Sequence, residues 1–390
     1  MSYLREQLIA QESSNKKIVD FCERVQRRDS RELLHGLSQR IVGQDVFVSA
    51  LYGQTMLKIS RLHRIAQGAD EHTLPRLAPF FVIGATASGK SFTIETFFEE
   101  LGIQLVTINT SAITTVGTYG DSFDDELSRI ADIQGSFPEK PIAILWDEID
   151  KMTASDGSPW NNPQAEILKY LEGGIYRGTC RHSRSVEESR YFTLDTSLVI
   201  DVFAGAFAGI EDIVRNRIRT QHSSFGFAAS ASAEPAANDL SVEALRALVT
   251  PADLGEWGLL GEFCGRLGTI LSIPALGSDS LKRIVCGSPY SLQARYSSLL
   301  PARTKLVITG AAADWLAGYA LKSGLGARAL DHEVGTLVAH ANICCLRDQL
   351  INQIIIDRPS GLDGLTLDVC TSARGLRSMR RVKKVHDRGG

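Results

Sequence analysis

The chain has 390 residues, of which 44% are hydrophobic and 22% charged, and its formal net charge at pH 7 is -3. This length fits roughly two or three domains of an ordinary globular protein, and the charge gives no nucleic-acid footprint over the whole chain. The seven cysteines are scattered and form no C-x-x-C pair, and no uncharged run reaches the roughly 18 residues that span a bilayer. We therefore expect a reduced, cytoplasmic protein without a membrane segment.

Residues 1–39 have a helix-forming composition and predict helices that flank the main domain, and a further helix is expected at about 45–65. Strand and helix patterns alternate after this point. The predicted strands are 80–83, 104–108, 142–146 and 198–203, and the predicted helices between them are 92–101, 123–131 and 164–171. Such alternation is typical of an open α/β fold, with a parallel sheet and helices on both of its faces.

The second part of the chain has a different pattern. Residues 221–240 are rich in Ala and Ser and predict a mobile loop. From about residue 278 the sequence is mainly helical, with predicted strands at 306–309 and 365–369. We expect a smaller α+β domain there. The predicted division is an N-terminal helical extension (1–39), a large domain (40–275), a small domain (276–370) and a basic tail (371–390) that ends the chain in solvent.

A glycine-rich motif follows the predicted strand 80–83. It fits G-x-x-x-x-G-K-[ST] and consists of Gly84, Ala85, Thr86, Ala87, Ser88, Gly89, Lys90 and Ser91. Between a strand and a helix, this pattern is the P-loop, whose backbone N–H groups surround phosphate oxygens. Lys90 is then expected to neutralise the β- and γ-phosphates of ATP, and the Ser91 hydroxyl to bind magnesium. The alternative is a glycine turn that happens to precede a helix.

Two acids follow the predicted strand 142–146, at the edge of the sheet where ligands bind in such folds. Asp147 is expected to hold magnesium, and Glu148 to orient and deprotonate the water that attacks ATP. Acids in this place are often helix caps instead. The P-loop upstream makes the catalytic interpretation the stronger one.

The run Asp147-Glu148-Ile149-Asp150 resembles AAA+ ATPases and, among them, the ClpX-type unfoldases of the Clp/HslU group. The similarity covers roughly residues 40–350. Further segments that resemble family motifs are 41–45 (the V-I-G-Q-[ED] box), 204–210 (G-G-A-F-A-G-L), 253–267 (the run ending in G-R-L) and 326–330 (T-G-A-R-G-L-R).

This resemblance implies roles for residues outside the two motifs. Val42 would line the adenine pocket, and Phe92, directly after Ser91, would also lie at the nucleotide. Arg266 would be an arginine finger that reaches the γ-phosphate of a neighbouring subunit, and Arg328 would be the sensor 2 cation of the small domain. A finger that acts in trans implies a closed homo-oligomeric ring, a hexamer in this family. The alternatives are that Arg266 is an ordinary surface residue and that Arg328 forms an ion pair on a helix face.

The family grips its polypeptide substrate with an aromatic pore loop. Here Tyr119 stands between Gly117 and Gly120, so it would grip a chain by contact area, although a plain turn is an alternative. The family's peptidase-docking I-G-F tripeptide is replaced by Phe225, Gly226 and Phe227. These residues either dock a ClpP-like peptidase or pack locally.

The chain also departs from the family. No cysteine pair precedes the ATPase core, so the zinc-binding N-terminal domain of ClpX-type proteins is not expected, and Arg184-Ser185-Val186 does not match the pore-entrance R-K-H motif. Asp201 lies in a predicted central strand, either in a core ion pair, which we favour, or in nucleotide sensing. The best interpretation is an ATP-dependent protein unfoldase with ATP and magnesium as cofactors. The alternatives are a RuvB-like nucleic-acid motor, disfavoured because residues 117–125 carry no basic side chain, and a nucleotide-gated scaffold with little turnover.

Overall fold

The computed structural model describes residues 2–113, 122–152, 163–181, 189–223, 240–359, 364–373 and 376–382. The chain divides into two compact units. The first contains residues 1–34, 46–85 and 90–274, and the second contains residues 35–45, 86–89 and 275–390. The division into functional domains stays a prediction.

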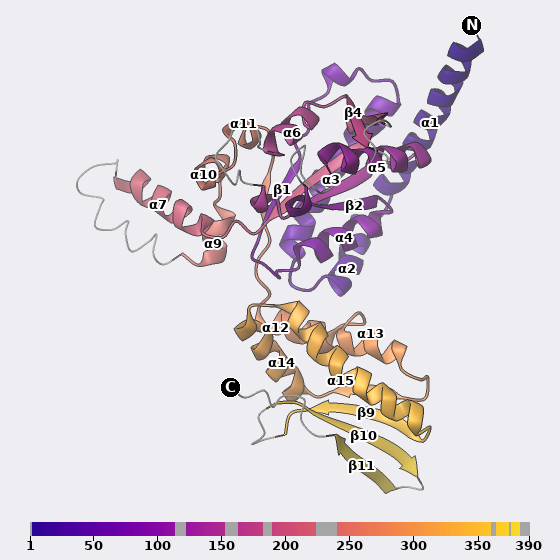
Figure 1. The fold of residues 1–390 in the computed structure, drawn as a ribbon, viewed down its shortest axis with the longest axis vertical. Helices are drawn as coiled ribbons and strands as arrows, with labels where there is room; N and C mark the ends of the chain where they lie inside the picture. The colour runs from indigo at the N-terminus through magenta and orange to yellow at the C-terminus, as the bar shows by residue number, and fades with distance from the viewer. Residues whose placement is uncertain are drawn as a thin grey trace. The chain divides into compact units, whose positions relative to one another are not determined.

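The first part of the chain contains most of the helices and a central sheet (Figure 1). Its elements are α1 (Ser2–Gln26), α2 (Ser30–Arg40), α3 (Asp45–Ala66), β1 (Phe80–Ile83), α4 (Lys90–Leu101), β2 (Gln104–Asn109), α5 (Phe123–Ser136), β3 (Ile142–Asp147), α6 (Pro163–Tyr170), β4 (Ile175–Arg181), β5 (Ser189–Asp195), β6 (Val199–Gly205), α7 (Ile210–Ser223), α9 (Val242–Ala247), α10 (Pro251–Trp257), α11 (Gly261–Cys264) and β7 (Ile270–Ser272).

The central sheet has five parallel strands in the order β2-β3-β6-β1-β7. Every residue of β1 and β6 is buried, because a parallel sheet is covered on both faces and its strands are apolar throughout. Because the strands run parallel, the carboxyl ends of β1 and β3 lie at the same edge of the sheet, where the P-loop and the paired acids are found. The predicted parallel α/β sheet is confirmed.

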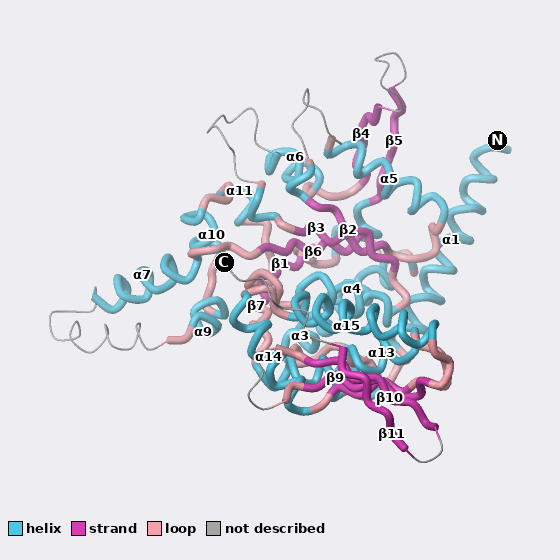
Figure 2. The backbone as a smooth tube through the Cα atoms, turned by 60° about the horizontal axis from the view of Figure 1, so that its bottom comes forward, coloured by secondary structure: helices cyan, strands magenta, loops and turns pink. Residues whose placement is uncertain are grey.

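The two faces of this sheet carry different helices (Figure 2). One face forms an aromatic-rich core with side chains of α5, α6, α7, α10 and α11. The helix α4 packs on β2 and β3, and the antiparallel hairpin β4–β5 packs on α5. The strand order places β6, and with it Asp201, directly beside β3.

The second unit has its own sheet and core. Its elements are α12 (Ser278–Lys282), a π-helical turn (Arg283–Gly287), α13 (Leu292–Leu299), β8 (Lys305–Ile308), α14 (Gly310–Ser323), α15 (Ala327–Arg347), β9 (Ile351–Asp357), β10 (Thr366–Ala373) and β11 (Leu376–Val382). The strands are ordered β11-β10-β9-β8, and α14 and α15 pack on this sheet. A small α+β unit was predicted, but β9 and β11 were not. Strand β11 lies in the segment that the sequence assigned to a basic tail, and it pairs antiparallel with β10.

Candidate active site

The P-loop leaves the sheet at the end of β1 and enters α4. Gly84 N–H donates to the carbonyl of Gly205 on the neighbouring strand, at 3.2 Å. Ala87 and Gly89 have positive φ angles of 61° and 88°. Glycine adopts this conformation freely, whereas at Ala87 it costs roughly 1–2 kcal/mol. The backbone is thus held in a strained turn directly before the first residues of a helix, where N–H groups lack helical partners and bind anions.

Lys90 and Ser91 begin α4 and both carry specific contacts. The Lys90 Nζ donates to the carbonyls of Gly84 at 2.8 Å and Ala85 at 3.0 Å, so the amine lies over the loop. The Ser91 hydroxyl donates to Oδ2 of Asp147 at 2.6 Å, across a separation of 56 residues. The structure therefore brings the two predicted magnesium ligands into direct contact.

The tip of the P-loop belongs to the second compact unit, together with residues 35–45. The buried Gln44 donates through Nε2 to the carbonyl of Ser88 at 3.2 Å. Gly326 also lies against the loop, since a Cβ atom there would be only 2.6 Å from the carbonyl oxygen of Ala87. Sequence reasoning missed the contact of Gln44, although its position in the V-I-G-Q box was the available signal.

The end of β3 presents the two acids in different environments. Asp147 Oδ1 accepts from the N–H of Glu148 at 2.9 Å, and the Asp147 carbonyl accepts from the Thr110 hydroxyl at 2.9 Å. Glu148 has φ 60° and ψ 35°, the left-handed region, and its side chain is exposed. Residues held in such strained conformations cluster at active sites. Burial and, to a smaller extent, the negative charge of Asp147 raise the pKa of Glu95 on α4.

The turn after Glu148 is fixed to the end of β6. Asp150 is buried, and its Oδ1 accepts from the N–H of Ala206 at 3.2 Å. A Cβ on Gly205 would lie 2.8 Å from Oδ1 of Asp150 and 2.5 Å from the Phe207 ring. This close approach requires glycine at position 205 and closes the turn onto the sheet.

Asp201 is held by neutral donors. Its Oδ1 accepts from Trp146 Nε1 at 2.9 Å and from the Tyr170 hydroxyl at 3.0 Å. Burial raises the pKa of Asp201, and these two donors together with the positive charge of Lys58 act in the opposite direction. The favoured core ion pair is wrong. Asp201 instead accepts hydrogen bonds from Trp146 of β3 and Tyr170 of α6, and the charge of Lys58 acts on it from a longer distance.

The remaining predicted residues are distributed over both units. Arg266 follows α11, and its Nη2 lies 3.9 Å from Oε1 of Glu172, with 39% of its side chain exposed. Phe92 on α4 is 54% exposed. Val42 is buried in the second unit, and Arg328 stands in the first turn of α15 in that same unit. Tyr119 and the tripeptide 225–227 lie outside the described residues.

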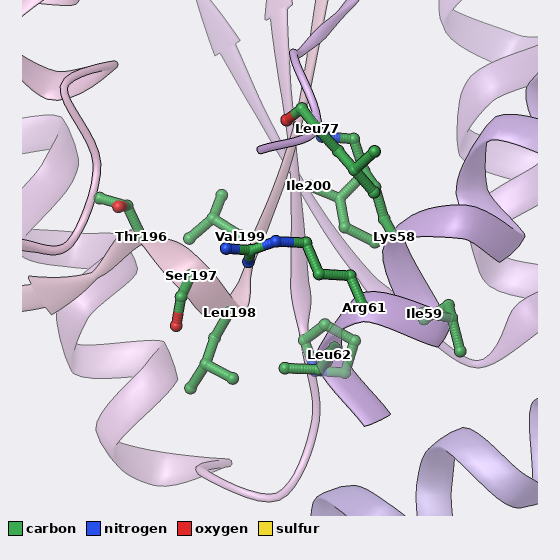
Figure 3. A pocket seen from close by; sticks show the side chains of 11 residues that line it. Lys58, Ile59, Arg61, Leu62, Leu77, Thr196, Ser197, Leu198, Val199 and Ile200 are labelled. Carbon is green, nitrogen blue, oxygen red and sulfur yellow. Dashed lines mark hydrogen bonds between the residues drawn. The ribbon is translucent and has the colours of Figure 1, made fainter. Parts of the chain in front are cut away.

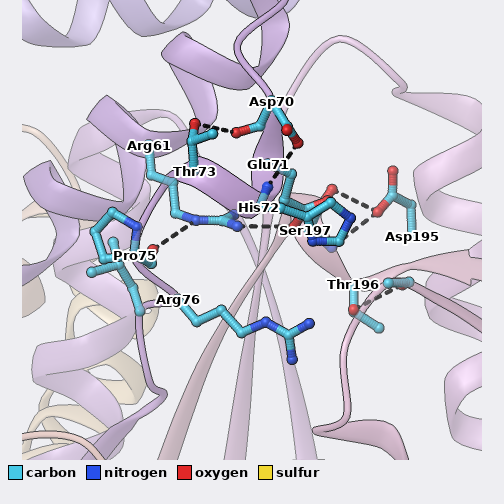
Figure 4. A network of polar contacts seen from close by, with 12 residues as sticks. Arg61, Asp70, Glu71, His72, Thr73, Pro75, Arg76, Asp195, Thr196 and Ser197 are labelled. Atoms are coloured by element: carbon cyan, nitrogen blue, oxygen red, sulfur yellow. Dashed lines mark hydrogen bonds and ion pairs between the residues drawn. The ribbon is translucent and has the colours of Figure 1, made fainter.

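A separate pocket lies at the opposite edge of the sheet, where β6 begins (Figure 3). It has a volume of about 80 Å³ and is lined by Lys58 and Arg61 of α3 and by residues 196–200. The Arg61 guanidinium donates to the carbonyl of Pro75 at 3.0 Å and to the carboxylate of Glu71 at 2.9 Å (Figure 4). None of the predicted nucleotide-site residues lines this pocket.

Two further observations concern metal and membrane. Among the described residues, no cluster of three or more His, Cys, Asp or Glu side chains could hold a metal ion. Magnesium does not need such a cluster, because it keeps several waters and binds one or two protein oxygens plus phosphate. A hydroxyl and a carboxylate in contact, as in Ser91 and Asp147, suit that chemistry. The described part of the chain also contains no helix that is long and apolar enough to cross a membrane.

Comparison with known families gives an independent result. Residues 80–186, which contain the P-loop, β3 and the paired acids, match the ATPase family associated with various cellular activities, AAA. The chain contains an AAA ATPase domain. The predicted ATP-hydrolase class and the α/β nucleotide-binding fold are thereby confirmed.

Curated relatives extend the similarity beyond the AAA domain. The ATP-dependent Clp protease ATP-binding subunit ClpX of Azotobacter vinelandii is 28% identical over 318 residues, which cover 78% of this chain and 68% of the relative. The ClpX subunit of Porphyromonas gingivalis is 25% identical over 322 residues, covering 80% and 76%. ClpX 3 of Methylococcus capsulatus is 25% identical over 345 residues, covering 84% and 78%. The predicted resemblance of the chain to ClpX-type ATPases is confirmed.

Proposed function

We propose that this AAA chain is an ATP-driven protein unfoldase of the ClpX type, which threads a polypeptide through the pore of a ring. The contact of Ser91 with Asp147, next to the exposed Glu148, carries the proposal. It joins the P-loop to the acids at the end of β3, as ATP hydrolysis requires. The similarity to ClpX proteins over about 80% of the chain supports the unfoldase class.

Four side chains share the hydrolytic work in this proposal. Ser91 and Asp147 would hold Mg²⁺, which neutralises charge on the β- and γ-phosphates of ATP. Lys90 exchanges the carbonyls of the loop for phosphate oxygens, because an ammonium group binds a charged oxygen more strongly than a carbonyl. Glu148 orients the attacking water and accepts its proton.

Two arginines couple hydrolysis to assembly. Arg266 is partly exposed and follows a short helix, so it can reach a neighbouring subunit and stabilise the charge of the transition state there. We propose a homo-hexameric ring on this basis. Arg328, at the start of α15 in the second unit, contributes the sensor 2 cation.

The substrate and partners follow from the same class. We propose that Tyr119 grips the polypeptide and that Phe225, Gly226 and Phe227 form an apolar contact for a ClpP-like peptidase. Nucleic acid is not expected as a substrate. These assignments rest on sequence motifs and on the similarity to proteins named as Clp protease subunits.

A trapping experiment tests the function. Glu148→Gln should bind ATP without hydrolysing it and should retain clients in an ATP-dependent complex, because release requires hydrolysis. Pull-down with this variant in ATP, with Lys90→Ala as the matched control that cannot bind ATP, should recover polypeptides in the first case only. Recovery of DNA in place of protein would overturn the unfoldase proposal and favour a nucleic-acid motor.

A further inference from the structure

Gln164, near the start of helix α6, contacts both the turn that follows Glu148 and the segment that leads to Arg266. Gln164 is 1% exposed. Gln164 Nε2 donates to the carbonyl of Met152 at 3.1 Å, and Gln164 Oε1 accepts from the N–H of Leu260 at 2.8 Å. Met152 ends the turn that starts with Glu148, and Leu260 is the residue from which α11 begins.

The contact with Leu260 determines where α11 sits. The first N–H groups of a helix need partners outside it, and the apolar side chain of Leu260 gives no cap. The amide oxygen of Gln164 acts as that partner. The short helix ends at Cys264, and Arg266 follows with its N–H donating to the carbonyl of Phe263 at 3.0 Å. The position of the Arg266 backbone therefore depends on Gln164.

The other end of α6 is also fixed. The Tyr170 hydroxyl donates to Asp201 on β6, and the same carboxyl oxygen accepts from Trp146, the residue before Asp147. The Trp146 ring stacks on Phe123 and Phe203, with centroids 5.4 Å and 5.7 Å away. Helix α6 thus has little freedom to move relative to β3, and the position of Gln164 is fixed with it.

We propose that Gln164 is a positioning residue that ties the hydrolytic turn of one subunit to the arginine finger that the same subunit presents to its neighbour. The primary amide of Gln164 satisfies both partners at once, since its NH₂ group donates to a backbone carbonyl and its oxygen accepts from a backbone N–H. Losing either hydrogen bond would leave a backbone polar group unsatisfied and would lower the stability of the fold. A shift of Met152 is therefore passed through Gln164 to Leu260. The inference rests on the proposed action of Arg266 in trans.

Mixed rings separate this role from a purely structural one. Wild-type subunits are mixed with an excess of inactive subunits of three kinds: Glu148→Gln alone, Glu148→Gln with Arg266→Ala, and Glu148→Gln with Gln164→Met. All turnover then comes from wild-type sites, each facing the finger of an inactive neighbour. Gln164→Met keeps the side-chain volume and removes both hydrogen bonds.

The proposal predicts that inactive subunits with Gln164→Met lower turnover per wild-type subunit about tenfold below those with Glu148→Gln alone, because they offer a displaced finger. Their own ATP affinity should remain within about twofold of the Glu148→Gln value. Equal turnover with both kinds of subunit overturns the inference. If Arg266→Ala in the inactive subunits has no effect either, the trans finger of the proposed function fails as well, so the two failures are distinguishable.

A second variant keeps the test valid if Gln164→Met does not assemble. Gln164→Glu retains an acceptor for the N–H of Leu260 but, when ionised, cannot donate to the carbonyl of Met152. Burial raises the pKa of a carboxyl group, and its protonated form can donate again. Turnover in the mixed ring should therefore recover, relative to Glu148→Gln alone, as the pH falls from about 8 to about 6. A ratio that does not change with pH contradicts the tie to Met152.

Discussion

The hydroxyl of Ser91 donates a hydrogen bond of 2.6 Å to the carboxylate of Asp147. Ser91 is the second residue of α4, and Asp147 ends β3, which is not the neighbour of β1 in the sheet, because β6 lies between them. The contact therefore depends on the parallel arrangement of β1, β6 and β3 with their carboxyl ends at one edge. This edge is where we propose that metal and phosphate bind.

Replacing Ser91 tests that edge directly. Ser91→Ala removes a proposed magnesium ligand and the partner of Asp147, so the Mg²⁺ concentration for half-maximal ATP turnover should rise about tenfold or more. Ser91→Thr keeps the hydroxyl and should behave like the wild type. The measurement is a magnesium titration of turnover. An unchanged midpoint in the alanine variant would remove Ser91 from the metal site.

Gly326 should be necessary for the shape of the P-loop. It has φ 53° and ψ -137°, and a Cβ atom would lie 2.6 Å from the Ala87 carbonyl. Gly326→Ala should therefore lower the free energy of unfolding by about 1–3 kcal/mol and weaken ATP binding. Urea titration and calorimetry with ATP measure the two effects.

The matched control for Gly326 is Gly318 in α14, where an added Cβ would meet no atom within 4 Å. Gly318→Ala should be neutral or stabilise the protein by up to about 1 kcal/mol, because alanine is the better helix former. If both alanine variants unfold at the same urea concentration, the close contact at Gly326 has no energetic weight.

Lys58 should make stability depend on alkaline pH. Burial lowers its pKa from 10.5 to about 8, with Arg61 acting in the same direction and Asp201 opposing it. Between these two pKa values the unfolded state binds more protons than the folded state, so the free energy of unfolding should rise as the pH increases from about 8 to about 10.5. Charged Lys58 therefore destabilises the fold below this range, and the penalty disappears above it.

Lys58→Met provides the comparison, since it keeps the apolar part of the side chain and cannot titrate. Urea unfolding of both proteins across this pH range should show the wild type gaining stability relative to the variant. The Lys58 side chain is partly accessible, so we predict the direction of the change. Parallel curves for the two proteins would show that Lys58 is as well solvated when folded as when unfolded.

The sequence predicts β1 with its observed bounds, because an apolar run before a glycine loop has one simple interpretation. The acids after β3 were found for a similar reason, since a buried strand that ends in charge marks the edge of a sheet. Local patterns of this kind need no knowledge of distant segments. The P-loop and the paired acids therefore lie at the ends of β1 and β3, as the sequence predicts, and their role in nucleotide binding stays a prediction.

The missed features involve distant partners or weak patterns. The hairpin β4–β5 mixes arginine, glycine and threonine without clear alternation, and β9 has a polar interruption at Asn352 and Gln353. Asp201 meets Trp146 and Tyr170 across 55 and 31 residues, and Gln164 meets Leu260 across 96. Only the packing of α6 on the sheet reveals these contacts. No local sequence signal predicts them.

The most direct test of the account is steady-state ATP turnover of the purified chain in Mg²⁺, compared with Glu148→Gln under the same conditions. We predict turnover in the wild type and a loss of about 100-fold or more in the variant, while calorimetry shows that the variant still binds ATP. Equal turnover in the two proteins would contradict the hydrolytic role of the β3 edge. The ATP-driven mechanism would fall with it.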